Sequence, residues 1–144
     1  MRASGVRKHP VMATSTATKV GRVKDLVVDA TGGRVVALRI AKSDAGEYVH
    51  WEDLSGVGPD AVVVPDLAVL GEARDRAAEL LDKRFRVKGK RILSDRGDEV
   101  GTVEDVEFDQ ETGQLTSFIT DDAPVAADRA VGLGGYALVV RAED

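Results

Sequence analysis

The chain contains one stretch twice, and this repeat constrains the fold more than any other feature. "VGRVKDLVVDATGGRVVALRI" covers residues 20–40 and "VGTVEDVEFDQETGQLTSFIT" covers residues 100–120, with Val, Gly, Val, Asp, Asp and Gly in the same register. Further along, "GVGPDAVVV" at 56–64 matches "GLGGYALVV" at 132–140 with a spacing four residues shorter. This four-residue difference falls in the loop before the second match, where changes of length cost little free energy. We therefore predict two copies of one module.

Short β-strands separated by turns account for each copy. In the first copy we predict strands at 20–29, 34–41, 47–50 and 61–64, with a single helical turn at "WEDL". The two long strands of the second copy are predicted at 100–109 and 114–120. Short strands with a turn roughly every ten residues favour a small antiparallel barrel over alternating βαβ units. The predicted fold class is all-β, with two small bent barrels in tandem related by an approximate twofold axis.

The residues between the copies, "PDLAVLGEARDRAAELLDKRF", have a helical pattern instead. Asp66 is a plausible N-cap, and we predict an amphipathic connecting helix over 66–83 between a first module at 1–65 and a second at 84–144. Its apolar face either packs on the core or serves as a partner helix. That face comprises Leu70, Ala73, Ala77, Leu80 and Leu81.

Each long strand departs from simple alternation at one place. Apolar positions are three residues apart at 23–26 and again at 103–106, where a flat strand needs two. A β-bulge there restores the inward face and turns the strand around a barrel corner. Asp25 and Asp105 are then predicted to lie at the bend and to accept hydrogen bonds from backbone N–H groups that the bulge leaves unpaired.

The hairpin turns repeat as well. Asp29 and Asp109 begin turns that end on Gly33 and Gly113. Asp bonds backbone N–H groups two residues on, and Gly takes the positive φ that such a turn needs. These four residues are therefore assigned to structural turns.

A metal or glycosidase site built from the paired aspartates is disfavoured. Four residues along a strand span about 13 Å, which is too far for one ion or for a glycosidic bond unless the bulge folds the carboxylates together. Calcium at the "DQETG" turn remains an alternative, although the turn has few ligands for it. We predict no metal and no cofactor.

One aromatic cluster stands out in a chain with 4% aromatic residues. Tyr48, His50 and Trp51 are close together, and Trp and Tyr are enriched at interface hot spots, so these residues are a candidate partner-binding surface. In the alternative, Trp51 plugs one end of the first barrel. The second copy has "AADRA" where the first has "HWEDL", so Trp51 has no counterpart.

The remaining composition excludes several classes of function. The chain has no cysteine, which excludes disulfides and thiolate metal sites, and it has neither a G-x-S-x-G motif nor a βαβ context for "GLGG". A net charge of −5 speaks against direct contact with nucleic acid. No signal-peptide core and no long apolar run are found, so we expect a cytoplasmic protein without membrane insertion. No catalytic residue is predicted.

The pattern of a Gly-Arg-Val-Lys-Asp strand, an Asp-x-x-x-Gly hairpin, "VHWEDL" and "DAVVV" resembles the PRC-barrel family. That family includes the cytoplasmic domain of the photosynthetic reaction centre H subunit and the C-terminal domain of the ribosome-maturation factor RimM. The likeness is greatest to the stand-alone tandem proteins of high-GC bacteria. It implies strongly bent small barrels that act as docking or assembly modules, without catalytic machinery common to the family.

We therefore expect a non-enzymatic protein-binding or scaffolding module whose partner is another protein. The alternatives are a ribosome- or RNA-associated assembly factor and a small-ligand or metal-binding module. A barrel of this size is only marginally stable alone. The two copies are therefore expected to pack together like a covalent version of a symmetric dimer. Association of the whole chain into a homodimer is a further expectation.

Overall fold

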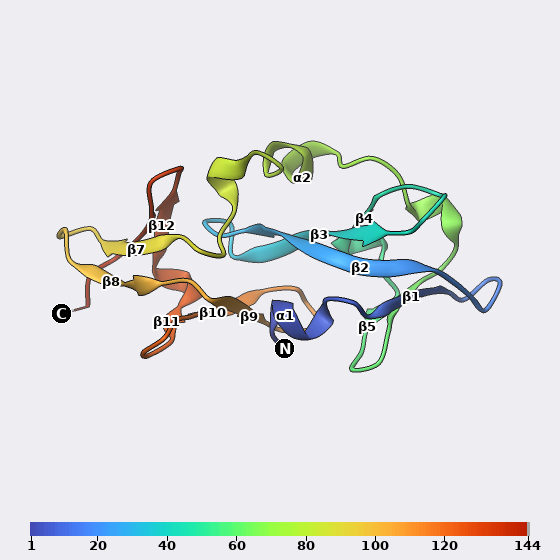
Figure 1. Cartoon of the computed structure of the whole chain (residues 1–144), viewed down its shortest axis with the longest axis horizontal. Coiled ribbons are helices and arrows are strands. Elements are labelled where there is room, and N and C mark those ends of the chain that lie inside the picture. Colours follow the sequence, from blue (N-terminus) through green and yellow to red (C-terminus); the bar gives the residue numbers. More distant parts are fainter. Residues whose placement is uncertain (144) are drawn as a thin grey trace.

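The computed structural model describes residues 1–143, which form mainly β-strands (Figure 1). The first module contains β1 (Pro10–Ala13), β2 (Thr18–Asp29), β3 (Arg34–Ala41), β4 (Tyr48–His50), β5 (Gly56–Val57) and β6 (Val62–Val64). The second contains β7 (Arg91–Ser94), β8 (Glu99–Thr102), β9 (Asp105–Phe108), β10 (Leu115–Ile119), β11 (Val125–Ala126), β12 (Ala130–Leu133) and β13 (Leu138–Val140). The helices are α1 (Ala3–Val6) and α2 (Asp75–Glu79), and 3-10 turns cover Trp51–Asp53, Leu67–Val69, Lys83–Phe85 and Ala127–Arg129.

Both modules have the same strand order. The first is one curled sheet ordered β4-β3-β2-β1-β6-β5. The second repeats every pairing as two sheets, β11-β10-β9 and β12-β13-β7-β8, because the strand equivalent to β2 is interrupted between Thr102 and Asp105. The predicted fold class is thereby confirmed, with one addition: β1–β6 and β7–β13 are parallel pairs, which the antiparallel expectation did not include.

Most predicted strands of the first copy are present within a residue or two of their expected ends, and "WEDL" begins with the expected helical turn. Two differences concern the strands. β1, β5, β7, β11 and β12 were not predicted, and the single strand expected at 100–109 is the two strands β8 and β9. The interruption falls at the predicted bend, and in β2 the pairing with β3 shifts register between Val23 and Asp25 at the equivalent place.

The two modules meet at their hairpins. Arg34 and Gln114 form an antiparallel bridge. The flanking backbone hydrogen bonds, at 2.8 and 2.9 Å, are reciprocal: an N–H of each hairpin donates to the glycine carbonyl of the other, from Val35 to Gly113 and from Leu115 to Gly33. Exchanging the two modules converts one bond into the other, so the approximate twofold axis passes between Arg34 and Gln114.

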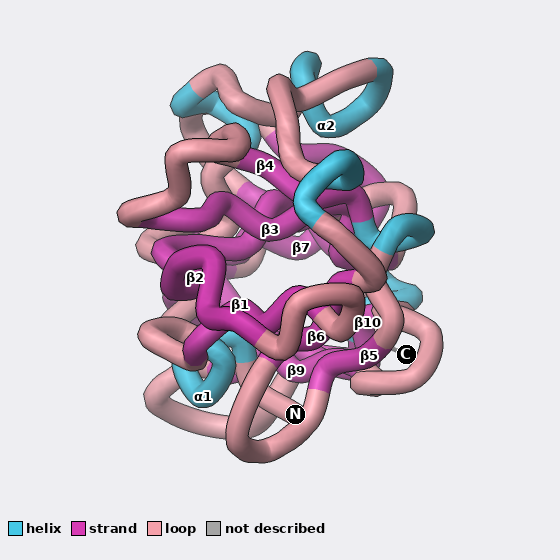
Figure 2. Tube along the Cα trace, turned by 90° about the vertical axis from the view of Figure 1, so that its right-hand side faces the viewer, coloured by secondary structure: helices cyan, strands magenta, loops and turns pink. Residues whose placement is uncertain are grey.

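The segment leading into each module packs on the other module. The Met1 ammonium donates to the Phe108 carbonyl over 2.9 Å and the Phe108 N–H donates to the Met1 carbonyl over 2.8 Å, which seats α1 beside β9. In the second module, Phe85 of the leading segment packs with a cluster of the first module that includes Val27 and Val36. Figures 1 and 2 show α1 and α2 on opposite sides of the strands.

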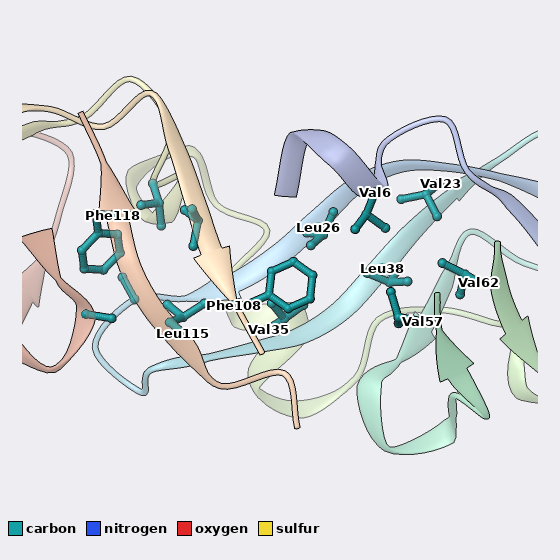
Figure 3. Packing of buried hydrophobic residues seen from close by; sticks show 14 of the residues in the cluster. Val6, Val23, Leu26, Val35, Leu38, Val57, Val62, Phe108, Leu115 and Phe118 are labelled. Carbon is teal, nitrogen blue, oxygen red and sulfur yellow. The ribbon is translucent and has the colours of Figure 1, made fainter. Parts of the chain in front are cut away.

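One apolar core runs through both modules (Figure 3). Phe108 of the second module lies beside Val35 and Leu26 of the first, and Phe118 extends the same cluster to the far end of the second module. Phe108 and Phe118 are among the largest side chains that are fully buried. Because the core crosses the seam, each module depends on the other for part of its burial.

The connecting segment differs from the predicted helix over 66–83. Asp66 does cap a helical turn, accepting a hydrogen bond from the Ala68 N–H over 2.8 Å, but that turn is the 3-10 turn Leu67–Val69. Gly71 then forms a β-bridge with Tyr48, which prevents helix there, and α2 covers only Asp75–Glu79. Leu81, predicted on the buried face, is 47% exposed.

Among residues 1–143, α2 is the longest helix with 5 residues, and none could cross a membrane.

Candidate functional site

Asp29 and Asp109 each begin a tight turn that ends on a glycine. The Gly33 N–H donates to the Asp29 carbonyl over 2.8 Å, and the Gly113 N–H donates to the Asp109 carbonyl over 2.7 Å. Gly33 and Gly113 have φ of +72° and +77°, in the left-handed region that favours glycine. Both aspartate carboxylates accept further N–H bonds within their own turns.

Asp29 also has a charged partner that Asp109 lacks among the described residues. The guanidinium of Arg76 in α2 binds the buried Asp29 carboxylate with two bonds, Nε to Oδ2 at 3.0 Å and Nη2 to Oδ1 at 3.2 Å. Burial alone raises the pKa of Asp29, but the hydrogen bonds from Arg76 and from the Gly32 N–H outweigh burial, so the pKa is lowered. The ion pair therefore fixes α2 to the first hairpin.

Asp25 and Asp105 lie at the two strand bends. Asp25 Oδ1 accepts a hydrogen bond from the N–H of the next residue over 2.9 Å, and Asp105 Oδ1 does the same over 2.8 Å. Asp25 also pairs with Arg7 at 3.1 Å, and Asp105 accepts bonds from the Ser4 N–H and hydroxyl. Both carboxylates thus hold the bend and the leading segment of the first module together.

The same two aspartates line one cavity of about 350 Å³ at the seam between the modules. The sequence analysis treated them as separate structural residues, whereas the twofold arrangement brings them to a shared site. Among the described residues, no group of three His, Cys, Asp or Glu side chains is placed to hold a metal ion. Apolar lining residues from both modules include Leu26, Val28 and Val106.

Tyr48 and His50, predicted as partner-binding residues, contact the connecting segment. The Tyr48 backbone exchanges two hydrogen bonds of 2.9 Å with Gly71, and His50 Nε2 accepts from the Arg74 N–H over 3.0 Å. His50 is 9% exposed, while the partly buried Tyr48 lines the cavity. Binding of an external partner by these residues stays a prediction.

Trp51 contacts the second module. Its ring meets Phe108 edge to face, with centroids 5.9 Å apart at 87°, and it covers the Gly113 turn. The counterpart of Trp51 at the start of the equivalent 3-10 turn is Ala127, and a Cβ added at Gly33 would have no atom within 4 Å. The indole thus packs across the seam, and it does so on one side of the twofold axis only.

A cationic segment, residues 83–91, was missed by the sequence analysis. Lys83, Arg86 and Lys88 line the cavity and also an open groove that reaches Tyr136, whose side chain is 73% exposed. The run "KRFRVKGKR" was visible in the sequence. A count of local charge, rather than the net charge, would have found it.

The comparisons with known proteins agree with this architecture. The PRC-barrel domain profile matches residues 1–70 and 83–144. The chain belongs to the PRC-barrel family. The two matched ranges correspond to the two modules, and α2 lies between them, so the chain is a tandem of PRC-barrel units. A search of curated proteins found no match to the chain.

The first prediction compares the two PRC-barrel turns. Gly33→Ala should cost about 1 kcal/mol, because Ala is disfavoured at positive φ. Gly113→Ala should cost about 1–3 kcal/mol more, because an added Cβ would lie 2.7 Å from Cε2 of Trp51. Urea unfolding of both variants provides the measurement. Equal losses would show that Trp51 does not pack on the second turn.

The second prediction concerns pH. The lowered pKa of Asp29 contributes stability that is present above its unfolded pKa, near 3.8, and is lost as pH falls through the folded pKa. Asp29→Asn should therefore cost about 1–2 kcal/mol at neutral pH, and the deficit should shrink as the pH falls below about 4. Urea unfolding from pH 7 to pH 3 measures this.

Asp109→Asn is the matched control, because Asp109 begins the equivalent turn of the second module and has no arginine partner among the described residues. It should show a smaller loss at neutral pH. A deficit for Asp29→Asn that stays constant down to pH 3 would contradict the ion-pair explanation.

Proposed function

We propose that the chain is a non-enzymatic binding module that holds a segment of another protein in the cavity between its two PRC-barrel units. The cavity of about 350 Å³ is the observation that supports this proposal. Its volume lies at the lower end of the range typical of ligand sites, about 300–1,000 Å³, and accommodates one or two apolar side chains. Because both modules contribute to its lining, the tandem arrangement is what creates the binding site.

Two of the polar groups that line the cavity, the carboxylates of Asp25 and Asp105, favour binding over turnover. Both Asp25 and Asp105 already accept hydrogen bonds from the strand bend and from the leading segment. Among the described residues that line the cavity there is no histidine. General acid–base catalysis needs a titratable group within reach of the reacting atoms and free to exchange a proton with them.

A small apolar ligand is the second candidate occupant, and the same cavity volume favours it. A ligand that binds only the folded chain raises the melting temperature by mass action. A metabolite screen by thermal shift therefore tests this candidate separately, since a protein segment is not among the screened compounds.

The third prediction fills the cavity. Val28 lines it, and the equivalent position in the second module is the buried Phe108, so Val28→Phe introduces a side chain that the repeated fold already accommodates. A photo-crosslinking residue is placed at Leu81, on the cavity lining, in the otherwise native chain. We expect one reproducible protein crosslink in cells of the native host, and its loss when Val28→Phe is added.

In the control for the crosslink, the photo-crosslinking residue replaces Lys19, an exposed residue of β2 that does not line the cavity. Val28→Ile is the control for the substitution, because it is a milder change at position 28. Circular dichroism checks that each variant is folded. The proposal fails if no protein crosslinks at position 81, or if Val28→Phe leaves the crosslink unchanged.

A further inference from the structure

The cationic segment is unusual for an acidic chain. Residues 83–91 contain six basic side chains and no acidic one, whereas the whole chain has a net charge of −5. The rest of the chain is therefore more negative than the total. The six residues are Lys83, Arg84, Arg86, Lys88, Lys90 and Arg91.

The segment presents its charges on one surface. Val87 is 5% exposed and belongs to the main core, and Phe85 packs partly buried against the first module. The intervening Arg84, Arg86 and Lys88 are exposed. The alternation of apolar and basic residues therefore anchors the backbone while directing the cations to solvent.

The internal repeat shows that the shared fold does not require a basic residue at most of these positions. Lys8 and Gly89 are equivalent, because each donates its N–H over 2.8 Å to the carbonyl of Val23 and of Val103, respectively. With that alignment, four of the six cations have uncharged counterparts in the first module. Arg84, Arg86, Lys90 and Arg91 correspond to Ala3, Gly5, His9 and Pro10.

Few acidic side chains pair with the basic side chains of the cationic segment. Arg84 pairs with Asp82 at 3.3 Å and Arg91 pairs with Glu99 at 3.5 Å, both between exposed side chains, where ion pairs contribute little. Within residues 1–143, the other four cations form no ion pair. They keep most of their electrostatic attraction for an external anion.

The segment joins the cavity to an exposed aromatic ring. Lys83, Arg86 and Lys88 line both the cavity and the open groove. At the far end of the groove, Arg91 lies over the Tyr136 ring at 5.3 Å and donates to its hydroxyl over 3.0 Å. A bound molecule that spans this surface meets a cavity with apolar and charged lining residues, then a row of cations.

We propose that this surface binds an acidic peptide segment of a partner protein, with one apolar side chain in the cavity and Asp or Glu side chains on the cationic segment. The proposal rests on the proposed function and specifies the chemistry of the partner. Arginine binds carboxylates through paired, charge-assisted hydrogen bonds, which suits Arg86, the arginine among the four cations that form no ion pair within residues 1–143, to this role.

The surface fits a peptide better than a nucleic acid. Single-stranded nucleic acids bind where several aromatic rings stack successive bases along a basic groove, and this groove is lined by one aromatic ring, that of Tyr136. The acidic remainder of the chain also repels a long polyanion. The apolar lining residues of the cavity, beside the cations, match an apolar side chain flanked by carboxylates.

The fourth prediction is tested with a random peptide library selected against the full chain. We expect the enriched peptides to combine acidic residues with a large apolar residue. A synthetic copy of one such peptide, followed by fluorescence anisotropy, should bind about tenfold more weakly to the variant K83E/R86E/K88E and should weaken as salt increases.

Two further variants control for folding and for net charge. K83Q/R86Q/K88Q removes the same charges without introducing acidic groups, and it should also weaken binding. K19E/K24E/K42E makes the same change in net charge at exposed residues outside the cavity and the groove, and it should bind normally.

Several results would overturn the inference. These are enriched peptides without acidic residues, unchanged affinity in both cationic-segment variants, or tighter binding of oligouridine RNA or of phosphatidylglycerol vesicles than of any peptide. A partner crosslink at position 81 that survives K83E/R86E/K88E but not Val28→Phe refutes the acidic-peptide inference and leaves the proposed function standing. A crosslink unaffected by either variant refutes the proposed function itself.

Discussion

The reciprocal backbone pairing of the two hairpins at Arg34 and Gln114 is the contact on which the rest of the structure depends. Separated modules would leave the N–H groups of Val35 and Leu115 without these partners, and Phe108 would lose its neighbours in the first module. The cavity is lined by both modules, so it exists only while this pairing holds. The cavity and the fold are thus consequences of the same interface.

Duplication within one chain lets the two halves differ. In a homodimer, every substitution appears on both sides of the twofold axis. Here Trp51 faces Gly113, whereas its counterpart Ala127 does not cover Gly33, and Asp29 has an arginine partner that Asp109 lacks among the described residues. Basic residues are likewise more numerous in one leading segment, with six at residues 83–91 and three at residues 2–10. The symmetric backbone supplies the scaffold, and the asymmetric side chains give the molecule one distinct face.

Local signals made much of this fold predictable. The repeat, the Asp-to-Gly turns and the bend at Asp25 depend on neighbouring residues, so they are visible in the sequence alone. Elements that depend on distant partners were missed: β1 is short and pairs in parallel with β6, and the expected helix is cut short because Gly71 pairs with Tyr48. The meeting of Asp25 and Asp105 at one cavity depends on how the modules pack, which strand patterns do not specify.

The connecting segment links the two modules in one chain. It is attached to the first module by the Tyr48–Gly71 bridge and the Asp29–Arg76 ion pair. A tether of this kind keeps the two halves at an effective concentration of about millimolar or above. Assembly of the seam is then independent of how many molecules a cell contains. Two modules on separate chains would dissociate at low copy number, whereas this protein keeps its cavity intact even when few molecules are present.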